Sequence, residues 1–191
     1  MSLAVSSARI FGIGLSRTGT SSLARALEVL GFRSVHFPAD PTTQREILRF
    51  FARPIGRLEL SLLREVDAIV DTPVCCVYPA LDLAYPGSKF VMTVREKESW
   101  LESCARYWRI PKEERLREFI HRIDTRLYGR ADFDRQAFAD TYDEYHARVA
   151  HYFRDRPADL LRLNVCAGEG WTALAPFVGA SVPTEPFPWE P

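Results

Sequence analysis

The sequence predicts an α/β fold of three layers, in which a central parallel sheet is covered by helices on both faces. Short apolar runs rich in β-branched and aromatic residues alternate with longer stretches whose apolar residues recur at helical spacing. Such alternation is typical of a parallel sheet covered on both faces. A polar, glycine-rich turn joins the first apolar run to the first helical stretch. At 191 residues, the chain is expected to form a single domain, 1–191.

The strands are predicted from short apolar runs that end at turn-forming residues. The first run ends at Gly14, the second is closed by Pro38, and the third ends in the carboxylate of Asp71. The fourth run is the clearest and follows the turn Pro86-Gly87. The predicted strands are residues 9–14, 33–37, 68–71, 89–94 and 160–163.

The helices are predicted from three-four spacing of apolar residues between these strands. Gly31 ends the first helix, and Pro54 and Gly56 separate the second from the third. The predicted helices are 20–30, 42–52, 57–65, 74–84 and 171–178, with a further helix from about residue 97 that carries Trp100 and Trp108. Two longer helices lie in a predicted helical insertion, about 109–156. The proline-rich tail 182–191 is expected to be extended on the surface.

The composition argues against several classes of protein. The chain has 25 basic residues (lysine and arginine) and 25 acidic ones (aspartate and glutamate), so its net charge is zero. No overall electrostatic field therefore favours nucleic acid or a membrane surface. No run approaches the ~20 apolar residues of a membrane span, and residues 1–8 do not resemble a secretion signal. The four cysteines show no C-x-x-C spacing, so we expect reduced thiols, no metal site and a cytoplasmic protein.

The turn after the first strand is the most informative stretch of the sequence. Its spacing Gly14-x-x-x-x-Gly19-x-Ser21 fits a P-loop, and this predicts a fold like that of P-loop nucleoside triphosphate hydrolases. A strand, a tight turn and a helix start direct several backbone N–H groups at one point, which binds anions and phosphate above all. Thr20 stands where the P-loop lysine is usual, and Arg17 is the cation within the loop.

A second anion site is predicted where the strand 89–94 ends. Arg95 follows this strand, and Ser99 and Ser103 lie four residues apart on one helix face. An arginine and this serine face can hold a phosphate, although a surface ion pair of Arg95 is the ordinary alternative. Ligands of parallel sheets bind at the carboxyl ends of the strands, so residues 16–22, Asp71 and Arg95 are expected at one edge.

Together these motifs resemble the sulfotransferase family. The loop Ser16-Arg17-Thr18-Gly19-Thr20-Ser21 is similar to the family's 5′-phosphosulfate loop, Pro-Lys-Ser-Gly-Thr-Thr. Arg95 and Ser103 have the spacing of its 3′-phosphate motif, an arginine that ends a strand and a serine eight residues later. The resemblance extends over 12–23, 31–38, 71–73, 88–103 and 177–188.

The resemblance implies a donor, 3′-phosphoadenosine-5′-phosphosulfate (PAPS), that binds without a metal and leaves as adenosine 3′,5′-bisphosphate. Arg17 would take the place of the family lysine at the 5′-phosphosulfate, and Arg95 with Ser103 would hold the 3′-phosphate. The other loop residues implied in donor binding are Ser16, Thr18, Gly19, Thr20, Ser21 and Ser22. The acceptor would be a hydroxyl or amine of a small molecule or a peptide.

The sequence departs from the family pattern in the general base and in a C-terminal loop. Many members carry a catalytic histidine where this chain has Asp71, so Asp71 and His36 are both candidate bases. The alternatives are a helix cap or a partner of loop hydroxyls for Asp71, and a hydrogen-bonded histidine beneath a loop for His36. His121, His146 and His151 are expected to be solvated. The family's basic, glycine-rich loop is here 166–171 without a basic residue, though Gly168, Gly170 and Trp171 could line the adenine.

Further alternatives stay open from the sequence. Tyr107, Trp108, Tyr128 and Phe133 could form an aromatic wall of the acceptor site, or simply core. In a nucleotide-dependent kinase or NTPase, Asp71 would hold Mg²⁺ with Thr20 or Ser21. A catalytically inactive nucleotide-binding scaffold is the third possibility. The sequence makes no prediction about the oligomeric state.

Overall fold

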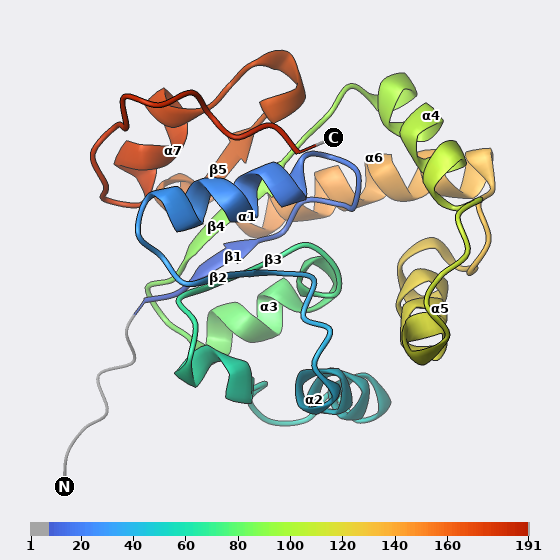
Figure 1. Cartoon of the computed structure of the whole chain (residues 1–191). Helices are drawn as coiled ribbons and strands as arrows, with labels where there is room; N and C mark the ends of the chain where they lie inside the picture. Colours follow the sequence, from blue (N-terminus) through green and yellow to red (C-terminus); the bar gives the residue numbers. More distant parts are fainter. Residues whose placement is uncertain (1–7, 191) are drawn as a thin grey trace, which may run out of the picture.

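The computed structural model describes residues 8–190. In this part of the chain five parallel strands form one sheet in the order β2-β3-β1-β4-β5 (Figure 1). The strands are β1 (Ile10–Gly12), β2 (Ser34–His36), β3 (Ala68–Val70), β4 (Lys89–Thr93) and β5 (Leu160–Leu163). Each lies within its predicted range. Because β1 is central, the loop that follows it emerges between β3 and β4, at the carboxyl edge of the sheet.

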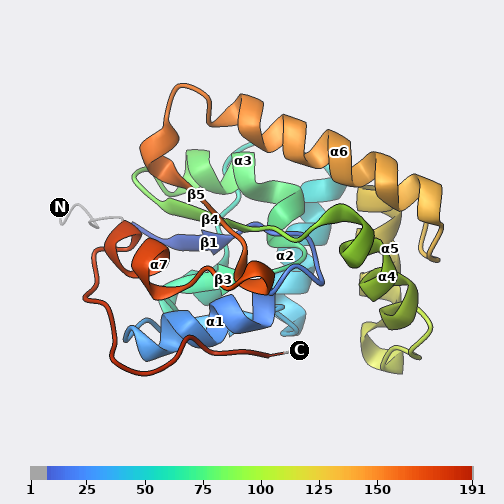
Figure 2. The same ribbon diagram turned by 90° about the horizontal axis from the view of Figure 1, so that it is seen from above.

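The helices form a layer on each face of the sheet, as the sequence predicts (Figures 1 and 2). They are α1 (Thr20–Val29), α2 (Pro41–Ala52), α3 (Val74–Ala84), α4 (Lys97–Tyr107), α5 (Glu114–Tyr128), α6 (Arg135–Tyr152) and α7 (Trp171–Phe177). Helices α1 and α7 pack on one face, where Ile10 and Val91 are buried. Helices α3 and α6 pack on the other, where Phe11 and Phe90 are buried. Successive strand residues thus alternate between two cores.

One predicted helix, 57–65, is wrong. Only Ser61–Arg64 forms a short 3₁₀ turn. The residues just before it have no regular secondary structure, and Leu58 and Leu60 are buried. The backbone N–H of Leu60 donates to the hydroxyl of Tyr85, 2.9 Å away. This bond to a distant residue takes the place of the intrahelical bond that the periodicity predicts.

The region 109–156 contains the two long helices that were predicted there, and they have different surroundings. Helix α6 covers the sheet: Phe138, Val149 and Phe153 are buried, and the Tyr145 hydroxyl donates to the carbonyl of Ile13 at 2.5 Å. Helix α5 lies with α4 beyond the carboxyl edge of the sheet (Figure 1). α6 is therefore an integral layer of the fold, and α5 helps to form the walls beside the loop that follows β1.

The C-terminal tail, residues 182–190, is extended as predicted, and it is held in a defined place. The Trp171 indole donates to the carbonyl of Glu185 at 2.7 Å, and Phe187 packs on Trp171 with ring centroids 4.7 Å apart. A Cβ at Gly170 would lie 2.9 Å from the Phe187 ring, so glycine allows this contact. From there the tail runs along α1 toward its N-terminus (Figure 2). In the described part of the chain, no helix has the length and apolarity that a membrane crossing needs.

Candidate functional site

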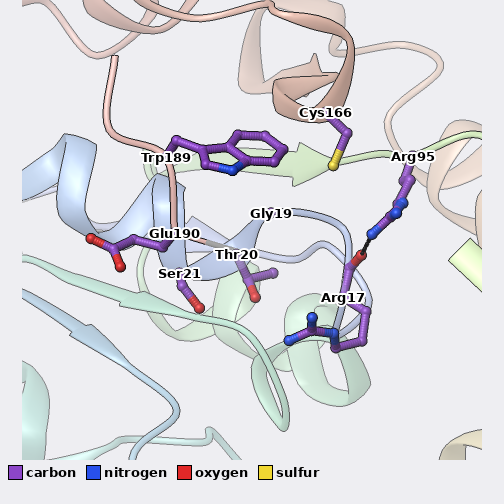
Figure 3. Close-up of a pocket in the computed structure, with 8 residues that line it drawn as sticks. All are labelled: Arg17, Gly19, Thr20, Ser21, Arg95, Cys166, Trp189 and Glu190. Atoms are coloured by element: carbon purple, nitrogen blue, oxygen red, sulfur yellow. Dashed lines mark hydrogen bonds between the residues drawn. The ribbon is translucent and has the colours of Figure 1, made fainter. Parts of the chain in front are cut away.

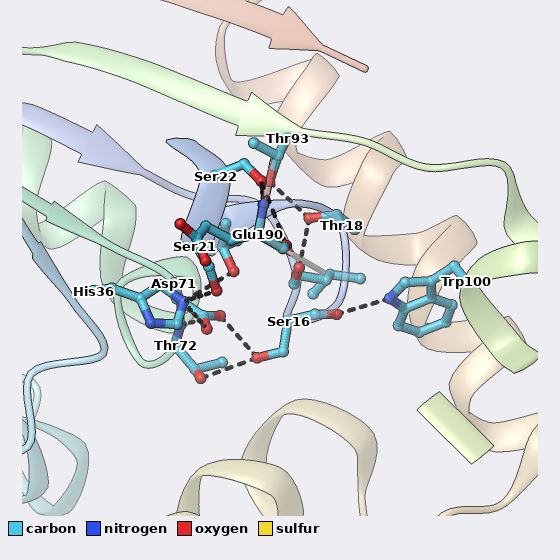
Figure 4. Close-up of polar contacts among 12 residues, drawn as sticks. Ser16, Thr18, Ser21, Ser22, His36, Asp71, Thr72, Thr93, Trp100 and Glu190 are labelled. Carbon is cyan, nitrogen blue, oxygen red and sulfur yellow. Dashed lines mark hydrogen bonds and ion pairs between the residues drawn. The ribbon is translucent and has the colours of Figure 1, made fainter. Parts of the chain in front are cut away.

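The loop between β1 and α1 is held in place by buried or partly buried hydrogen bonds, among them bonds to β4 and α4. The Thr18 hydroxyl donates to the carbonyl of Leu15 at 2.6 Å and lies 2.7 Å from the hydroxyl of Thr93. The Trp100 indole donates to the carbonyl of Ser16 at 2.9 Å (Figure 4). A Cβ at Gly14 would come within 1.9 Å of the Thr93 hydroxyl. The loop can approach β4 this closely only because residue 14 is glycine.

The N-terminus of α1 is open toward the edge of the sheet. Gly19, which precedes the helix, has φ +98° and offers no side-chain cap, and the first turn carries no acidic residue. The N–H groups of Gly19, Thr20, Ser21 and Ser22 donate to no other residue between 8 and 190. Unpaired N–H groups and the positive end of the helix dipole create a site for an anion.

Two arginines without acidic partners flank this helix start (Figure 3). The Arg95 guanidinium donates to the Arg17 carbonyl at 3.4 Å and to the Ser99 hydroxyl at 2.9 Å. The Arg17 Nε donates to Ser103 at 3.2 Å, and its guanidinium lies 5.1 Å from the ring centroid of Tyr107. Neither arginine forms an ion pair within the described residues. Their charges are therefore available to an anion at the loop.

The predicted pairing of Arg95 with Ser103 is only partly seen. Ser103 is buried, with 3% of its surface exposed, and it accepts the hydrogen bond of Arg17. Ser99 is the serine that contacts Arg95. The two arginines and the two serines form one cluster, in which Ser103 orients Arg17 and Ser99 orients Arg95.

The two candidate bases, His36 and Asp71, form a pair at the ends of neighbouring strands. The His36 Nε2 lies 3.0 Å from the Asp71 Oδ2 (Figure 4) and within 3.3 Å of the Thr20 and Ser21 hydroxyls. Burial opposes the charge on His36, but the hydrogen bond to Asp71 and its charge outweigh burial and raise the pKa of the imidazole.

The carboxylate of Asp71 is fully engaged by its neighbours. Burial would raise its pKa, yet the bonds from His36, Ser16 and Thr72 hold the pKa below its usual value. Its Oδ1 accepts from the Ser16 hydroxyl at 2.8 Å and from the Thr72 N–H at 2.7 Å. The backbone of Asp71 has φ +79°, in the left-handed region that aspartate tolerates better than most residues.

A small pocket opens between the loop and the C-terminal tail. We call it the loop pocket; its volume is about 40 Å³, and it is lined by Arg17, Gly19, Thr20, Ser21, Arg95, Cys166, Trp189 and Glu190 (Figure 3). Sequence reasoning missed the last two, because no local pattern in the tail indicates where it folds. The Glu190 N–H donates to the Ser22 hydroxyl at 2.9 Å. Trp171, a candidate for the adenine side, is buried beneath the tail instead.

Other predicted groups lie outside the loop pocket. His121 and His151 are exposed as predicted. His146 does not match the prediction. Its ring is tilted by 33° to that of Tyr142, with ring centroids 3.9 Å apart, and its Nε2 is buried without a partner among the described residues. Burial lowers its pKa to about 4. Tyr128 is buried against Phe138, with stacked rings 3.9 Å apart. Tyr128 is thus part of the core, whereas Tyr107, Trp108 and Phe133 are only partly buried.

A Mg²⁺ site of the kinase type is not apparent at Asp71. Both of its oxygens are occupied by contacts within the protein. Among residues 8–190, no three histidine, cysteine or acidic side chains converge as metal ligands would.

Comparison with known proteins identifies the family. "Ava biosynthesis cluster protein M" of Aspergillus versicolor is 26% identical over 216 aligned positions, which cover 94% of this chain and 79% of that protein. The model of the sulfotransferase domain matches residues 9–190. The match confirms the resemblance that the loop and the Arg95 motif indicate. The chain belongs to the sulfotransferase domain family.

Proposed function

We propose that the protein transfers a sulfuryl group from PAPS to a hydroxyl or amine of a small-molecule or peptidyl acceptor. The observation that carries this proposal is the uncapped start of α1, flanked by Arg17 and Arg95 without acidic partners. Two cations at one edge of a parallel sheet suit a ligand with two separate anionic groups. Family membership supports a transferase.

Residues of the loop would hold the 5′-phosphosulfate of the donor. The free N–H groups at the start of α1 and the Arg17 guanidinium would neutralise charge on the phosphate as it leaves. The donor supplies the sulfuryl group in an in-line displacement, and no metal is needed in this proposal. Arg95 would bind the 3′-phosphate, with Ser99 fixing its orientation. Ser103 contributes indirectly, because it holds Arg17. The residues proposed to contact the donor are Ser16, Arg17, Gly19, Thr20, Ser21, Ser22 and Arg95. Thr18, which was also expected there, is buried and its N–H and hydroxyl bond within the protein, so we assign it a role in shaping the loop.

His36 is the better general base of the two candidates. Both oxygens of Asp71 are engaged and its pKa is lowered, so this carboxylate is a poor proton acceptor. Asp71 instead raises the pKa of His36 and fixes the tautomer with the proton on Nε2, which leaves Nδ1 to accept a proton. We therefore assign Asp71 a positioning role.

Donor binding requires movement of the C-terminal tail. The loop pocket holds about 40 Å³, whereas pockets for nucleotide-sized ligands measure roughly 300–1,000 Å³. Trp189 and Glu190 cover this space, and Glu190 is joined to α1 by two hydrogen bonds with Ser22. These contacts are weak enough for a tightly bound ligand to displace them.

Thermal-shift titrations test the proposal. Adenosine 3′,5′-bisphosphate at ~100 times its dissociation constant should raise the melting temperature by a few degrees. Arg17→Ala and Arg95→Ala should each abolish this shift. Arg106→Ala, a change at an exposed arginine of α4, and His121→Ala should leave it unchanged. Normal binding by the Arg17 and Arg95 variants would defeat the site assignment.

The same titrations separate the alternatives. Stabilisation by Mg·ATP or Mg·GTP but not by the bisphosphate would indicate a kinase or NTPase. Tight bisphosphate binding without transfer to any member of a broad acceptor panel would indicate a catalytically inactive scaffold.

A further inference from the structure

A second, larger cavity lies between the end of α4 and helix α5. Its volume is about 280 Å³, and we call it the α4–α5 cavity. Trp108, Ile110 and Ile120 supply apolar lining. The charged side chains that line it are Arg109, Lys112, Arg117, Asp124 and Asp132. A cavity near the lower end of the usual ligand-pocket volume, with both apolar and charged groups in its lining, suits a small polar organic molecule.

The wall of this cavity already holds one ammonium group. The Nζ of Lys112 lies 3.4 Å from the ring centroid of Tyr107 and 5.4 Å from that of Trp108. It donates to the Tyr107 carbonyl at 3.4 Å. Aromatic faces attract cations in this geometry. Burial lowers the pKa of Lys112, and the charge of Asp124 opposes this shift.

Asp124 adds a buried carboxyl group near these two rings. We call Tyr107, Trp108 and Asp124 the amine cage. Only 6% of its surface is exposed, and its Oδ2 accepts from the Trp108 indole at 3.1 Å. Its Oδ1 has no hydrogen-bond partner among the described residues, and the side chain lines the cavity. Burial raises the pKa of Asp124 to about 7, against the opposing effects of the Trp108 bond and the Lys112 charge. The unpaired Oδ1 can accept a hydrogen bond from a ligand in the cavity.

The cage adjoins the proposed reaction centre. The same Tyr107 ring that contacts Lys112 lies 5.1 Å from the guanidinium of Arg17. The charge of Asp71 is close enough to contribute to the raised pKa of Asp124. The Tyr107 ring thus contacts one residue that lines the α4–α5 cavity and one residue of the loop.

We infer that the α4–α5 cavity is the acceptor site, and that it recognises an amine-bearing small molecule with an apolar body. The ammonium of the acceptor takes the place of the Lys112 ammonium against Tyr107 and Trp108 and pairs with Asp124, while a hydroxyl elsewhere on the molecule faces the reaction centre. This assignment of the acceptor class rests on the proposed transfer reaction, but the binding of the amine does not depend on it.

Calorimetric titration of the full chain tests the cage with two matched probes. Tyramine and 4-ethylphenol share a phenol and differ in the amine. We expect tyramine to bind at least about tenfold more tightly, the effect of one well-placed cation contact. Asp124→Asn should abolish the difference. Asp132→Asn, which changes an exposed acid lining the same cavity, should preserve it. Lys112→Ala should increase tyramine affinity, because the competing ammonium is gone.

The outcomes distinguish this inference from the proposed function. No preference for tyramine, or a preference that survives Asp124→Asn, would overturn the inference. If the Asn variant does not fold, as judged by its melting curve, a failure of Lys112→Ala to increase affinity would overturn it. Binding of adenosine 3′,5′-bisphosphate is measured separately on the same variants. If the unmodified chain does not bind adenosine 3′,5′-bisphosphate, the proposed reaction is refuted. The tyramine titrations would then still test the amine cage.

Discussion

Replacing Asp71 by asparagine isolates the ion pair that we assign to proton transfer. Asparagine tolerates the positive φ of this position, and its carbonyl can still accept the bonds from Ser16 and Thr72. What is lost is the negative charge 3.0 Å from His36. Because burial of the imidazole remains and its counter-charge does not, the pKa of His36 must fall.

The cost in stability follows from the exposure of the two partners. Removing one member of a fully buried pair costs about 3–5 kcal/mol. Here 8% of the Asp71 side chain but 35% of the His36 side chain is exposed, so solvent screens the interaction and we expect about 1–2 kcal/mol.

The pH dependence of this loss has a definite sign. A raised His36 pKa stabilises the fold below the ordinary value of 6.5, and this contribution is lost as pH rises through the raised value. A lowered Asp71 pKa stabilises the fold above 3.8, and this contribution is lost as pH falls through the lowered value. Both act together near pH 5, so the variant should lose most stability there and less at pH 9.

Two measurements check these expectations without a known acceptor. NMR titration of the imidazole protons gives the pKa of His36, and urea unfolding at pH 5 and pH 9 gives the stability difference. Asp67→Asn is the matched control, because Asp67 precedes β3 and pairs with the exposed Arg33; it should leave His36 unchanged and cost no more than about 1 kcal/mol. An unchanged His36 titration in the Asp71 variant, or equal destabilisation at both pH values, would refute the reasoning.

Three further changes test the framework of the site. Gly14→Ala should destabilise the fold by about 1–3 kcal/mol, because its Cβ would meet the Thr93 hydroxyl at 1.9 Å; an unchanged urea midpoint would contradict this. Tyr145→Phe should cost about 1–2 kcal/mol, since the buried carbonyl of Ile13 loses its donor; a neutral effect on unfolding would show that the bond is dispensable. Ser22→Ala should speed proteolysis of the C-terminal tail with little loss of stability, as followed by mass spectrometry; wild-type cleavage rates would mean that this hydroxyl does not hold the tail.

The sequence predicts the strands well because each is a short, continuous apolar run between turn residues. The segment 57–65 fails for a physical reason: Leu58, Leu60 and Leu63 are all buried, which mimics helical spacing. A non-helical segment can bury the same residues. Whether the chain forms a helix or such a segment depends on partners that are distant in sequence, such as Tyr85. His146 fails similarly, because its burial depends on how α6 packs.

The site is predictable where topology alone brings residues together. The carboxyl-edge rule places the loop, Asp71 and Arg95 at one edge, and the structure agrees. Which serine contacts which arginine depends on side-chain conformations that spacing does not define. Trp189, Lys112 and Asp124 were missed, because loop paths between helices and along the surface are set by tertiary contacts. Tyr107 and Trp108 were named as a possible wall of the acceptor site, with core as the alternative.

The contact between Ser22 and Glu190 joins positions 168 residues apart. The loop pocket is thus bounded by a segment near the beginning of the described chain and by another near its end. During synthesis, when the N-terminal part emerges from the ribosome first, a nascent chain that has completed β1 and α1 still lacks Trp189 and Glu190, which cover this pocket. Under the proposed reaction, a donor would have to displace this cover in the folded chain, and it would meet no such cover in a chain cut before residue 182.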